Sequence, residues 1–353
     1  MPKQLVALAP RKASLIDYED KPVSRNEIKV KLEFASPKHG TELAAFRGTS
    51  PYFDDYYDED LQLFMPRDGS QHQIVVFGEW NLGNQWVGRI IDIGSDVAAF
   101  KLGERVCGYG GIRETHNIDA VNNNALFKLP EDMSWQNAVC YDPAAFALGG
   151  VRDGHVRLGD RVAVFGLGAI GQLAVQMCKL AGASYVAAVD PISLRRKVAL
   201  DNGADQAFDP TTEDVGLELK RTTRRGGMDV IIETSASEHA ISHVMRGLAY
   251  GGTIAYVGAA GKFRGNSFDL GREAHHNNGK LIFSRACSEP NPDHPRWSYR
   301  RIQEEGWEML KSGRLNCTNI IYPVVSFADS AVAYEKYVDK EPDSGLKLGV
   351  SFL

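Results

Sequence analysis

The first part of the chain alternates apolar and polar residues at period two, which is typical of strands with one buried face. The clearest case is "EIKVKLEFAS", in which Ile28, Val30, Leu32 and Phe34 fall on one side. Similar patterns of strand and turn occupy "WVGRIIDIGSDV" and "LGERVCGYG". We therefore expect the chain up to about residue 150 to be rich in β-structure.

A different pattern begins near residue 151, where apolar strands alternate with helices that carry one apolar face. The stretch "DRVAVFGLGAIGQLAVQMCKLAGASYVAAVD" contains a strand, a glycine turn, a helix closed by Gly182 and a second strand. Further helices and strands follow up to "GKLIFSRA". Strands that are apolar on both faces and alternate with helices indicate a parallel sheet covered on both sides.

Beyond about residue 290 the pattern is mixed again. It predicts amphipathic helices in "SYRRIQEEGWEMLKSG" and "FADSAVAYEKYVD" and a closing strand in "GLKLGVSFL". We interpret this tail as a return to the first domain. The expected fold is therefore α/β, with a discontinuous domain from residues 1–150 and 290–353 and a doubly wound parallel-sheet domain from residues 151–289.

Composition and charge narrow the classes of function. Lys and Arg number 40 against 45 Asp and Glu, and the net charge of −5 provides no basic surface for nucleic acid or anionic lipid. The start of the chain lacks the apolar core of a signal peptide, and no apolar run approaches the length of a membrane span. The five cysteines occur singly, so neither a structural zinc site nor a disulfide framework is indicated. We expect a cytoplasmic protein that acts on a small molecule, with no nucleic-acid or membrane partner.

The segment "VAVFGLGAIG" has the pattern of a dinucleotide-binding turn, because it follows a strand and opens a helix. Gly166 permits the tight turn, Gly168 lets the backbone approach a pyrophosphate, and Gly171 lets helix and strand pack closely. The helix N-terminus offers N–H groups and a partial positive charge to the phosphates. Three further predicted cofactor-binding residues complete this turn: Leu167, Ala169 and Ile170.

An acidic residue, Asp190, ends the next predicted strand, about 20 residues past the last glycine. A carboxylate there hydrogen-bonds the adenosine ribose and repels a 2′-phosphate, which favours NAD over NADP. Arg195 and Arg196 follow within one turn and could meet a 2′-phosphate, but we expect both on the exposed face of their helix. Arg195 is kept as a candidate cofactor contact.

Two later strands end in "ETSAS" and "VGAAG", residues 233–237 and 257–261. Ligands of doubly wound folds bind at the carboxyl ends of the strands. These segments therefore add four candidate cofactor-binding residues: Thr234, Ser235, Val257 and Gly258.

The order of these parts, together with "GDRVAVFGLGAIGQLAVQMCKLAGA", "DVIIETS" and "GLAYGGTIAYVG", resembles the medium-chain dehydrogenase/reductase superfamily over nearly the whole chain. Within it, "GTE" and "HHNNGKLIFSRACSEPNPDHPRW" are similar to the sorbitol and threonine dehydrogenase branch, including zinc-lacking proteins like bacteriochlorophyllide dehydrogenase. The resemblance implies a GroES-like catalytic domain, a Rossmann NAD-binding domain and a homodimer or homotetramer.

The zinc enzymes of this superfamily carry three ligands that can be compared with this chain. Where they have a cysteine, this chain has His39 in "HGTE"; where they have a histidine, it has Asn84 in "GNQ"; the third position holds Asp142. The cluster of four cysteines that binds a structural zinc is also missing. A catalytic zinc usually has three strong donors plus water, and Asn84 offers only a neutral carbonyl. We therefore expect no bound metal.

Without a metal, the hydroxyl proton of an alcohol needs a general acid or base and hydrogen-bond donors. Thr41 takes the position of the family's proton-relay hydroxyl, and His39 has an imidazole whose ordinary pKa of about 6.5 suits proton transfer. Lys38 could donate to an oxyanion, and Asp142 could orient His39. The alternative for His39 and Asp142 is a structural pair that fills the emptied metal site.

Candidate substrate contacts are polar side chains near these positions. Asn84 and Gln85 could hydrogen-bond several hydroxyls, which fits a polyol or sugar better than a simple alcohol. Glu42 and His275 complete the set. The acidic and aromatic segment 50–73 is either a lid or a solvated insertion, and the sequence does not separate the two.

The sequence thus predicts an NAD-dependent, zinc-independent dehydrogenase that acts on a secondary alcohol of a polyol, sugar, glycoside or cyclitol. Three alternatives remain: a zinc-dependent polyol dehydrogenase that uses His39 and Asp142, an NADPH-dependent quinone or enone reductase, and a non-catalytic NAD-binding protein. Asp190 argues against the second of these.

Overall fold

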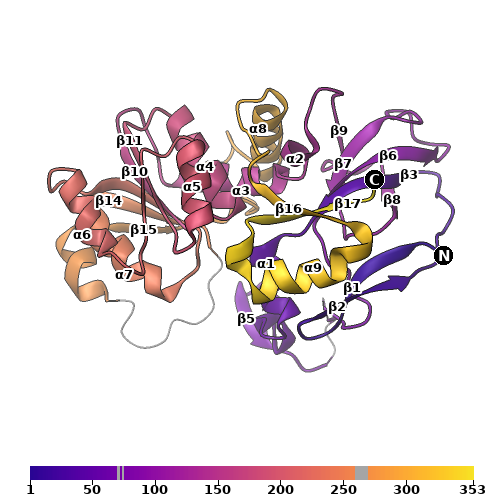
Figure 1. Cartoon of the computed structure of the whole chain (residues 1–353), viewed down its shortest axis with the longest axis horizontal. Helices are drawn as coiled ribbons and strands as arrows, with labels where there is room; N and C mark the ends of the chain where they lie inside the picture. Colours follow the sequence, from indigo (N-terminus) through magenta and orange to yellow (C-terminus); the bar gives the residue numbers. More distant parts are fainter. Residues whose placement is uncertain (70–71, 74, 259–268) are drawn as a thin grey trace. The chain divides into compact units, whose positions relative to one another are not determined.

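The computed structural model describes residues 1–69, 72–73, 75–258 and 269–353 and divides the chain into two compact units (Figure 1). The first unit comprises residues 1–131 and 322–353, and the second comprises residues 132–321. The described residues include no helix that is long and apolar enough to cross a membrane.

The first unit is built on antiparallel sheets. Its largest sheet has seven strands in the order β16-β17-β3-β6-β7-β9, with β8 also paired to β3. Figure 1 shows β17, from the end of the chain, beside β3, from its beginning. The elements are β1 (Lys3–Ala9), β2 (Lys12–Asp17), β3 (Glu27–Ser36), α1 (His39–Phe46), β4 (Asp55–Asp58), β5 (Leu63–Pro66), β6 (Gln85–Ile93), β7 (Arg105–Tyr109), β8 (Thr115–Asp119), β9 (Phe127–Lys128), β16 (Ile321–Ser326), α9 (Ser330–Tyr334) and β17 (Lys347–Ser351), with short 3₁₀ or π turns at Pro51–Phe53, Phe327–Asp329, Glu335–Lys340 and Pro342–Ser344.

The alternation in β3 is confirmed. Ile28, Val30 and Leu32 are buried, whereas Phe34 is only partly buried. Ile28, Val30 and Leu32 join one apolar core with Trp86 of β6. The strand therefore forms because its apolar face has a core to cover.

The second unit contains a six-stranded parallel sheet in the order β12-β11-β10-β13-β14-β15. The chain starts in the middle of this sheet and winds outward in both directions, which is the doubly wound order of nucleotide-binding folds. The elements are α2 (Trp135–Ala138), α3 (Tyr141–Asp153), β10 (Arg161–Phe165), α4 (Ala169–Leu180), β11 (Tyr185–Val189), α5 (Ser193–Asp201), β12 (Gln206–Phe208), α6 (Val215–Thr222), β13 (Met228–Glu233), α7 (Glu238–Gly247), β14 (Leu248–Tyr256), a π turn (Leu270–Ala274), β15 (Lys280–Phe283) and α8 (Tyr299–Lys311).

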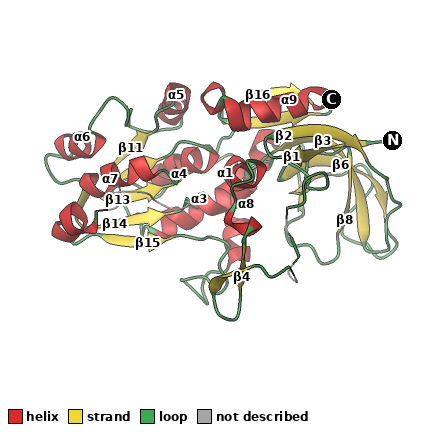
Figure 2. Cartoon of the chain, turned by 90° about the horizontal axis from the view of Figure 1, so that it is seen from below, coloured by secondary structure: helices red, strands yellow, loops and turns green. Residues whose placement is uncertain are grey.

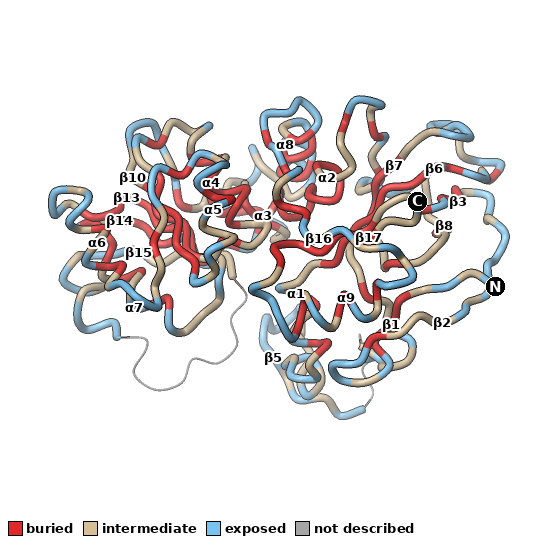
Figure 3. The backbone as a smooth tube through the Cα atoms, in the orientation of Figure 1, coloured by how far each residue is buried: buried red, intermediate tan, exposed pale blue. Residues whose placement is uncertain are grey.

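Both faces of the parallel sheet are covered, as the apolar strands predict. Successive residues of β10 point to opposite faces, yet Val162, Ala163, Val164 and Phe165 are all buried. Figure 2 shows the helices of this unit lying along its strands, and Figure 3 shows the central strands as buried.

Helix α8 belongs to the second unit, although the sequence assigned everything after residue 290 to the first domain. Its apolar stripe packs on α3, which precedes the parallel sheet. Ile302 joins a core cluster with Ala145, and the rings of Trp307 and Tyr141 meet edge to face with centroids 6.2 Å apart. The pairing of α3 and α8 therefore moves both boundaries of the unit outward from 151 and 289.

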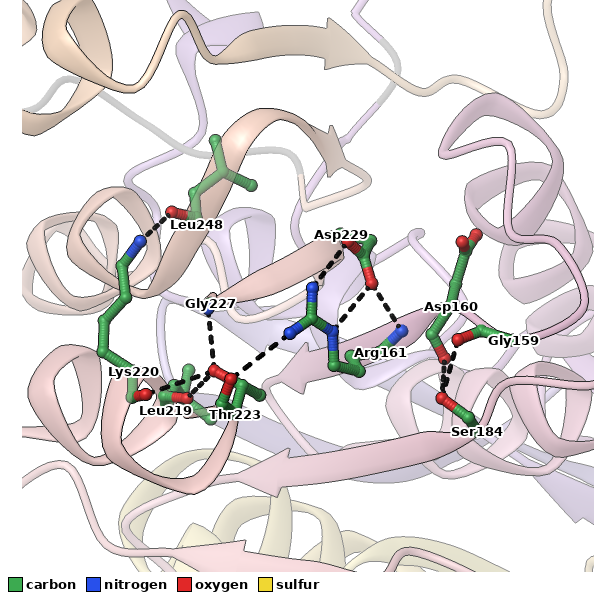
Figure 4. A network of polar contacts seen from close by, with 10 residues as sticks. All are labelled: Gly159, Asp160, Arg161, Ser184, Leu219, Lys220, Thr223, Gly227, Asp229 and Leu248. Carbon is green, nitrogen blue, oxygen red and sulfur yellow. Dashed lines mark hydrogen bonds and ion pairs between the residues drawn. The ribbon is translucent and has the colours of Figure 1, made fainter. Parts of the chain in front are cut away.

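A polar network fixes the amino ends of the parallel strands (Figure 4). The guanidinium of Arg161, at the start of β10, donates to both carboxylate oxygens of Asp229 on β13, each at 3.0 Å. It also donates to the carbonyl of Thr223, whose hydroxyl accepts from the N–H of Gly227 at 2.7 Å. These contacts hold adjacent strands together at their amino ends. The glycine turn lies at the opposite, carboxyl ends of the strands.

Candidate active site

The glycine turn between β10 and α4 has the geometry that the sequence predicts. Gly166 has a φ of +83°, and a Cβ there would lie 2.6 Å from the amide nitrogen of Ser235. A Cβ on Gly171 would lie 1.8 Å from the carbonyl oxygen of Gly166. A Cβ on Gly168, in contrast, would meet no atom within 4 Å. Two glycines are thus needed for the chain's own packing, and the third borders open space that suits a ligand.

Helix α4 starts at this open space, with Gly168 as its N-cap and Ala169 and Ile170 in its first turn. The first N–H groups of a helix have no intrahelical acceptor and carry a partial positive charge. They can therefore bind the pyrophosphate of a dinucleotide.

The carboxylate of Asp190 is buried and points back to the glycine turn. One oxygen accepts from the N–H of Leu167 and the other from the N–H of Ile192, each at 2.8 Å. The guanidinium of Arg195 lies 3.8 Å from this carboxylate, and Arg196 donates to the Asp190 carbonyl at 2.7 Å. Asp190 therefore braces the turn in addition to standing at the ribose position.

The arginines differ from the prediction that both lie on an exposed helix face. Their side chains are only 18% and 21% exposed. Arg196 forms an ion pair of 3.0 Å with Asp209, just after β12, and Arg195 faces Asp190. The attraction of two nearby carboxylates turns the side chains inward, which helix periodicity alone could not reveal.

The carboxyl ends of β13 and β14 converge on the glycine turn. The hydroxyl of Thr234 donates to the carbonyl of Gly166 at 2.7 Å, and Ser235 packs against the same glycine. The N–H groups of Val257 and Gly258 both donate to the carbonyl of Glu233, at 2.8 and 3.2 Å. Residues 259–261 of "VGAAG" lie outside the described residues. The structure thus brings the predicted cofactor residues of three strands together.

Glu233 is a buried acid at this edge that the sequence analysis did not select. Its carboxylate accepts from the N–H and hydroxyl of Ser235 and from the N–H of Ala236. Burial raises the pKa of Glu233 above its ordinary value. The signal in the sequence was an acid that ends an apolar strand, in "DVIIE".

In the first unit, Glu42 connects the "HGTE" turn to the "GNQ" loop. Its buried carboxylate accepts from the N–H of Lys38 at 2.6 Å, from the N–H of Gly83 at 2.9 Å and from the hydroxyl of Tyr334 at 2.9 Å. Burial raises the pKa of Glu42, although these three hydrogen bonds oppose the change. Glu42 therefore holds the two motifs together.

Asn84 and Gln85 lie next to this turn because β6 begins where β3 ends. Gln85 pairs with Ser36 in the sheet and is fully buried, and the N–H of Asn84 donates to the carbonyl of Ser36 at 3.2 Å. The side-chain nitrogen of Asn84 is buried and has no hydrogen-bond partner among the described residues. A buried amide without a partner is costly, so a ligand oxygen there would be favourable.

The imidazole of His39, the first residue of α1, is held by strand β17. The N–H of Leu348 donates to Nε2 of His39 at 3.2 Å, and the ammonium of Lys347, which is buried, donates to the carbonyl of Pro37 at 2.6 Å. A backbone amide can only donate, so Nε2 carries the lone pair and a neutral His39 carries its hydrogen on Nδ1. Lys347 and Leu348 were not found from the sequence, because they lie more than 300 residues away.

The remaining predicted catalytic and substrate residues are placed as follows. Thr41 is exposed on the first turn of α1, and Lys38 is the N-cap of that helix. Asp142 is buried in the first turn of α3, and His275 is exposed, with its ring edge-on to His276. The last two belong to the second unit.

His39 and Asn84, which stand where the family's zinc enzymes carry metal ligands, do not suit zinc. Among the described parts of the chain, no group of three or more His, Cys, Asp or Glu side chains could hold a metal ion. A neutral imidazole has one nitrogen lone pair, and in His39 the N–H of Leu348 occupies it. Asn84 adds only a neutral amide, whereas catalytic zinc is held by imidazole, thiolate or carboxylate.

Comparison with known proteins adds independent evidence. A family model described as "Zinc-binding dehydrogenase" matches residues 169–293. D-guloside 3-dehydrogenase of Escherichia coli (strain K12) is 53% identical over 350 residues, which cover 99% of this chain and 100% of that protein.

Solved structures share the fold at low sequence identity. 2R,3R-butanediol dehydrogenase from Bacillus subtilis superposes with a TM-score of 0.75 at 21% identity, and a protein from Sinorhizobium meliloti 1021 bound to NADP with a TM-score of 0.76 at 18%. Each comparison covers 99% of both chains. The predicted α/β class, GroES-like plus Rossmann, is confirmed. The identity with D-guloside 3-dehydrogenase over the full length shows that the chain belongs to the medium-chain dehydrogenase/reductase family and is an enzyme of the dehydrogenase class.

Proposed function

We propose that the protein is an NAD-dependent, zinc-independent dehydrogenase that oxidises a secondary hydroxyl of a glycoside or a related sugar, polyol or cyclitol. The observation that carries this proposal is the 53% identity, over the full length, with D-guloside 3-dehydrogenase. A D-guloside or another hexoside is therefore the first substrate to test.

The second unit supplies the cofactor site in this proposal. The glycine turn and the N-terminus of α4 bind the pyrophosphate, and Asp190 with Arg195 meets the adenosine ribose. The loops that begin at Thr234 and Val257 border the nicotinamide. Asp190 supports NAD over NADP through charge repulsion of a 2′-phosphate. The structural relative from Sinorhizobium meliloti 1021 was solved bound to NADP, so the experiment below compares the two cofactors.

The first unit supplies the proton chemistry. When bound, the nicotinamide accepts the hydride from the substrate carbon. The hydroxyl of Thr41, which is exposed, accepts the hydroxyl proton of the substrate as it releases its own hydrogen to water. His39 keeps its hydrogen on Nδ1, since Leu348 occupies Nε2, and donates a hydrogen bond that opposes the negative charge growing on the substrate oxygen.

The remaining candidates keep the roles that the sequence predicts. Lys38 is a second donor to the oxyanion, and Asp142 stays a predicted catalytic residue. Asn84 and Gln85 bind further hydroxyls of the substrate, and the buried amide nitrogen of Asn84 supports that role. Glu42, in our proposal, acts on the substrate only by holding these loops. His275 stays a predicted substrate contact.

We also propose that the first unit, residues 1–131 and 322–353, carries the substrate and that the second unit, residues 132–321, carries NAD. We expect a cytoplasmic homodimer or homotetramer. Size-exclusion chromatography with light scattering measures the mass directly, and a monomer would contradict the expected assembly.

A panel of glycosides, sugars, polyols and cyclitols, incubated with NAD or NADP, tests the proposal. We expect NADH to form with a glycoside and the product to be a ketone at a ring carbon, which mass spectrometry after borodeuteride reduction identifies. A strong preference for NADPH with quinones would favour a reductase. Binding of NADH without turnover of any alcohol would favour a non-catalytic protein.

A further inference from the structure

Gln172 is a fully buried amide in α4, one residue past the last glycine of the turn. Its nitrogen donates to the carbonyl of Leu167 at 3.2 Å and to the carbonyl of Arg195 at 2.8 Å. Its oxygen accepts from the side-chain amide of Asn202 at 3.1 Å. An apolar residue would be expected at a buried helix position, so these three hydrogen bonds explain why an amide is present.

These bonds fix two elements of the cofactor site together. Leu167, in the middle of the glycine turn, is held on both sides: Asp190 accepts from its N–H, and Gln172 donates to its carbonyl. Arg195 lies in the first two turns of α5, and Gln172 holds its backbone. Gln172 thus connects the turn that meets the pyrophosphate with the helix that carries the arginine at the ribose position.

We infer that Gln172 is a positioning residue that sets both the affinity for NAD and the preference for NAD over NADP. This inference rests on the proposed function of the turn as a dinucleotide site. While the backbone of Arg195 is fixed, its guanidinium stays near the carboxylate of Asp190, 3.8 Å away. Without the bond from Gln172, Arg195 gains freedom to turn toward a 2′-phosphate, and the turn itself loosens.

Gln176 provides a matched control on the same helix. It lies one turn further along α4 and also makes two hydrogen bonds, both to the backbone of Asn316 at 2.8 and 2.9 Å. None of these bonds involves the glycine turn or Arg195. Loss of Gln176 therefore reports what a purely structural amide of this helix contributes.

The experiment compares Gln172→Leu and Gln176→Leu with the wild type. NADH and NADPH are titrated by their fluorescence, and thermal unfolding of the free protein is measured in parallel. For Gln172→Leu we expect NADH to bind about tenfold more weakly, because the glycine turn and the backbone of Arg195 lose the hydrogen bonds that hold them in position. The ratio of NADH to NADPH affinity should fall at least about threefold. For Gln176→Leu we expect a lower melting temperature and both affinities within about twofold of wild type.

Two additional variants keep the test decisive. Gln172→Met retains the length of the side chain if Gln172→Leu does not fold, and should show the same changes. Adding Arg195→Ala to the Gln172 variant should remove the relative gain for NADPH. Equal changes of affinity in the Gln172 and Gln176 variants, or an unchanged NADH to NADPH ratio, overturn the inference. A wild-type protein that binds neither nucleotide overturns the proposed function itself.

Discussion

The glycine turn of the second unit and the His39 turn of the first unit are built in opposite ways. In the glycine turn the backbone sets the geometry: Gly166 and Gly171 have no room for a Cβ, and the N–H of Leu167 donates to the carboxylate of Asp190. In the His39 turn, hydrogen bonds of the Glu42 and His39 side chains set the geometry. The carboxylate of Glu42 joins two loops. The backbone N–H of Leu348, near the other end of the chain, donates to the imidazole of His39.

This difference explains which region tolerates change. A backbone-built turn serves one ligand shape and depends on glycine at fixed positions. A turn held by side chains can exchange a metal ligand for a residue that hydrogen-bonds, and keep its frame through contacts such as those of Glu42. We conclude that the family's chemistry can change in the first unit while the cofactor site remains the same.

The largest effect should come from the His39 turn. His39→Ala and Thr41→Val should each reduce turnover about 10²- to 10³-fold, because the first removes a donor to the developing oxyanion and the second removes the hydroxyl that relays the substrate proton. The affinity for NADH should stay within about twofold, since the glycine turn is untouched. Steady-state kinetics and NADH titration measure the two quantities.

Thr41→Ser, which retains the hydroxyl, is the control for this prediction and should keep most of the activity. Unchanged turnover in both the His39 and the Thr41 variants would end the assignment of proton transfer to this turn.

Two alanine substitutions test the backbone-built turn. Gly171→Ala should lower the free energy of unfolding by about 3 kcal/mol, because its Cβ would lie 1.8 Å from a backbone oxygen. Gly168→Ala meets no atom of the chain and should cost less than about 1 kcal/mol. It should nevertheless weaken NADH binding about tenfold or more, because the methyl group enters the predicted pyrophosphate space. Equal stability of the two variants in urea would refute the claim that Gly171 serves packing and Gly168 serves the ligand.

Stability of the first unit should depend on pH through His116. The ring is buried, stacks on Trp86 and donates from Nε2 to the carbonyl of Gly111 at 2.9 Å. Burial lowers the pKa of His116 to about 4, with a smaller contribution from the charge of Arg113.

Because the folded pKa lies below the unfolded value of 6.5, His116 stabilises fully above pH 6.5, and this contribution is lost as the pH falls toward 4. The loss amounts to about 3 kcal/mol. Urea unfolding of the wild type and of His116→Phe at pH 7 and pH 4.5 measures it. An identical pH dependence in both proteins would show that His116 is not responsible.

The smallest effect concerns Ala236, in the loop after β13. It has a φ of +55°, where an alanine is strained and a glycine is not. Ala236→Gly should therefore raise the free energy of unfolding by about 1 kcal/mol. A destabilised variant would show that the conformational entropy which glycine adds to the unfolded chain outweighs the relief of strain.

Local pattern was enough to predict the elements of the second unit. The glycine turn, the parallel strands and the amphipathic α8 are each encoded within about 15 residues, and the structure bears them out. The assignment of α8 to the second unit required contacts with α3, which lies more than 150 residues away. Short-range periodicity carries no information about such partners.

Long-range contacts also limited the prediction of the site. The sequence identified His39, Asn84 and Glu42 as neighbours through their motifs, and the structure joins the two loops through Glu42. The sequence could not reveal that the N–H of Leu348 donates to Nε2 of His39. It also could not reveal that nearby carboxylates attract Arg195 and Arg196. These details depend on which backbone groups meet in the folded chain.

The central claim is that the His39 turn handles the substrate proton without a metal. Protein purified without chelator should contain far less than one zinc per chain by mass spectrometry, and its turnover of a glycoside with NAD should not change after chelation. A stoichiometric zinc content, with turnover that chelation abolishes and zinc restores, would contradict the account.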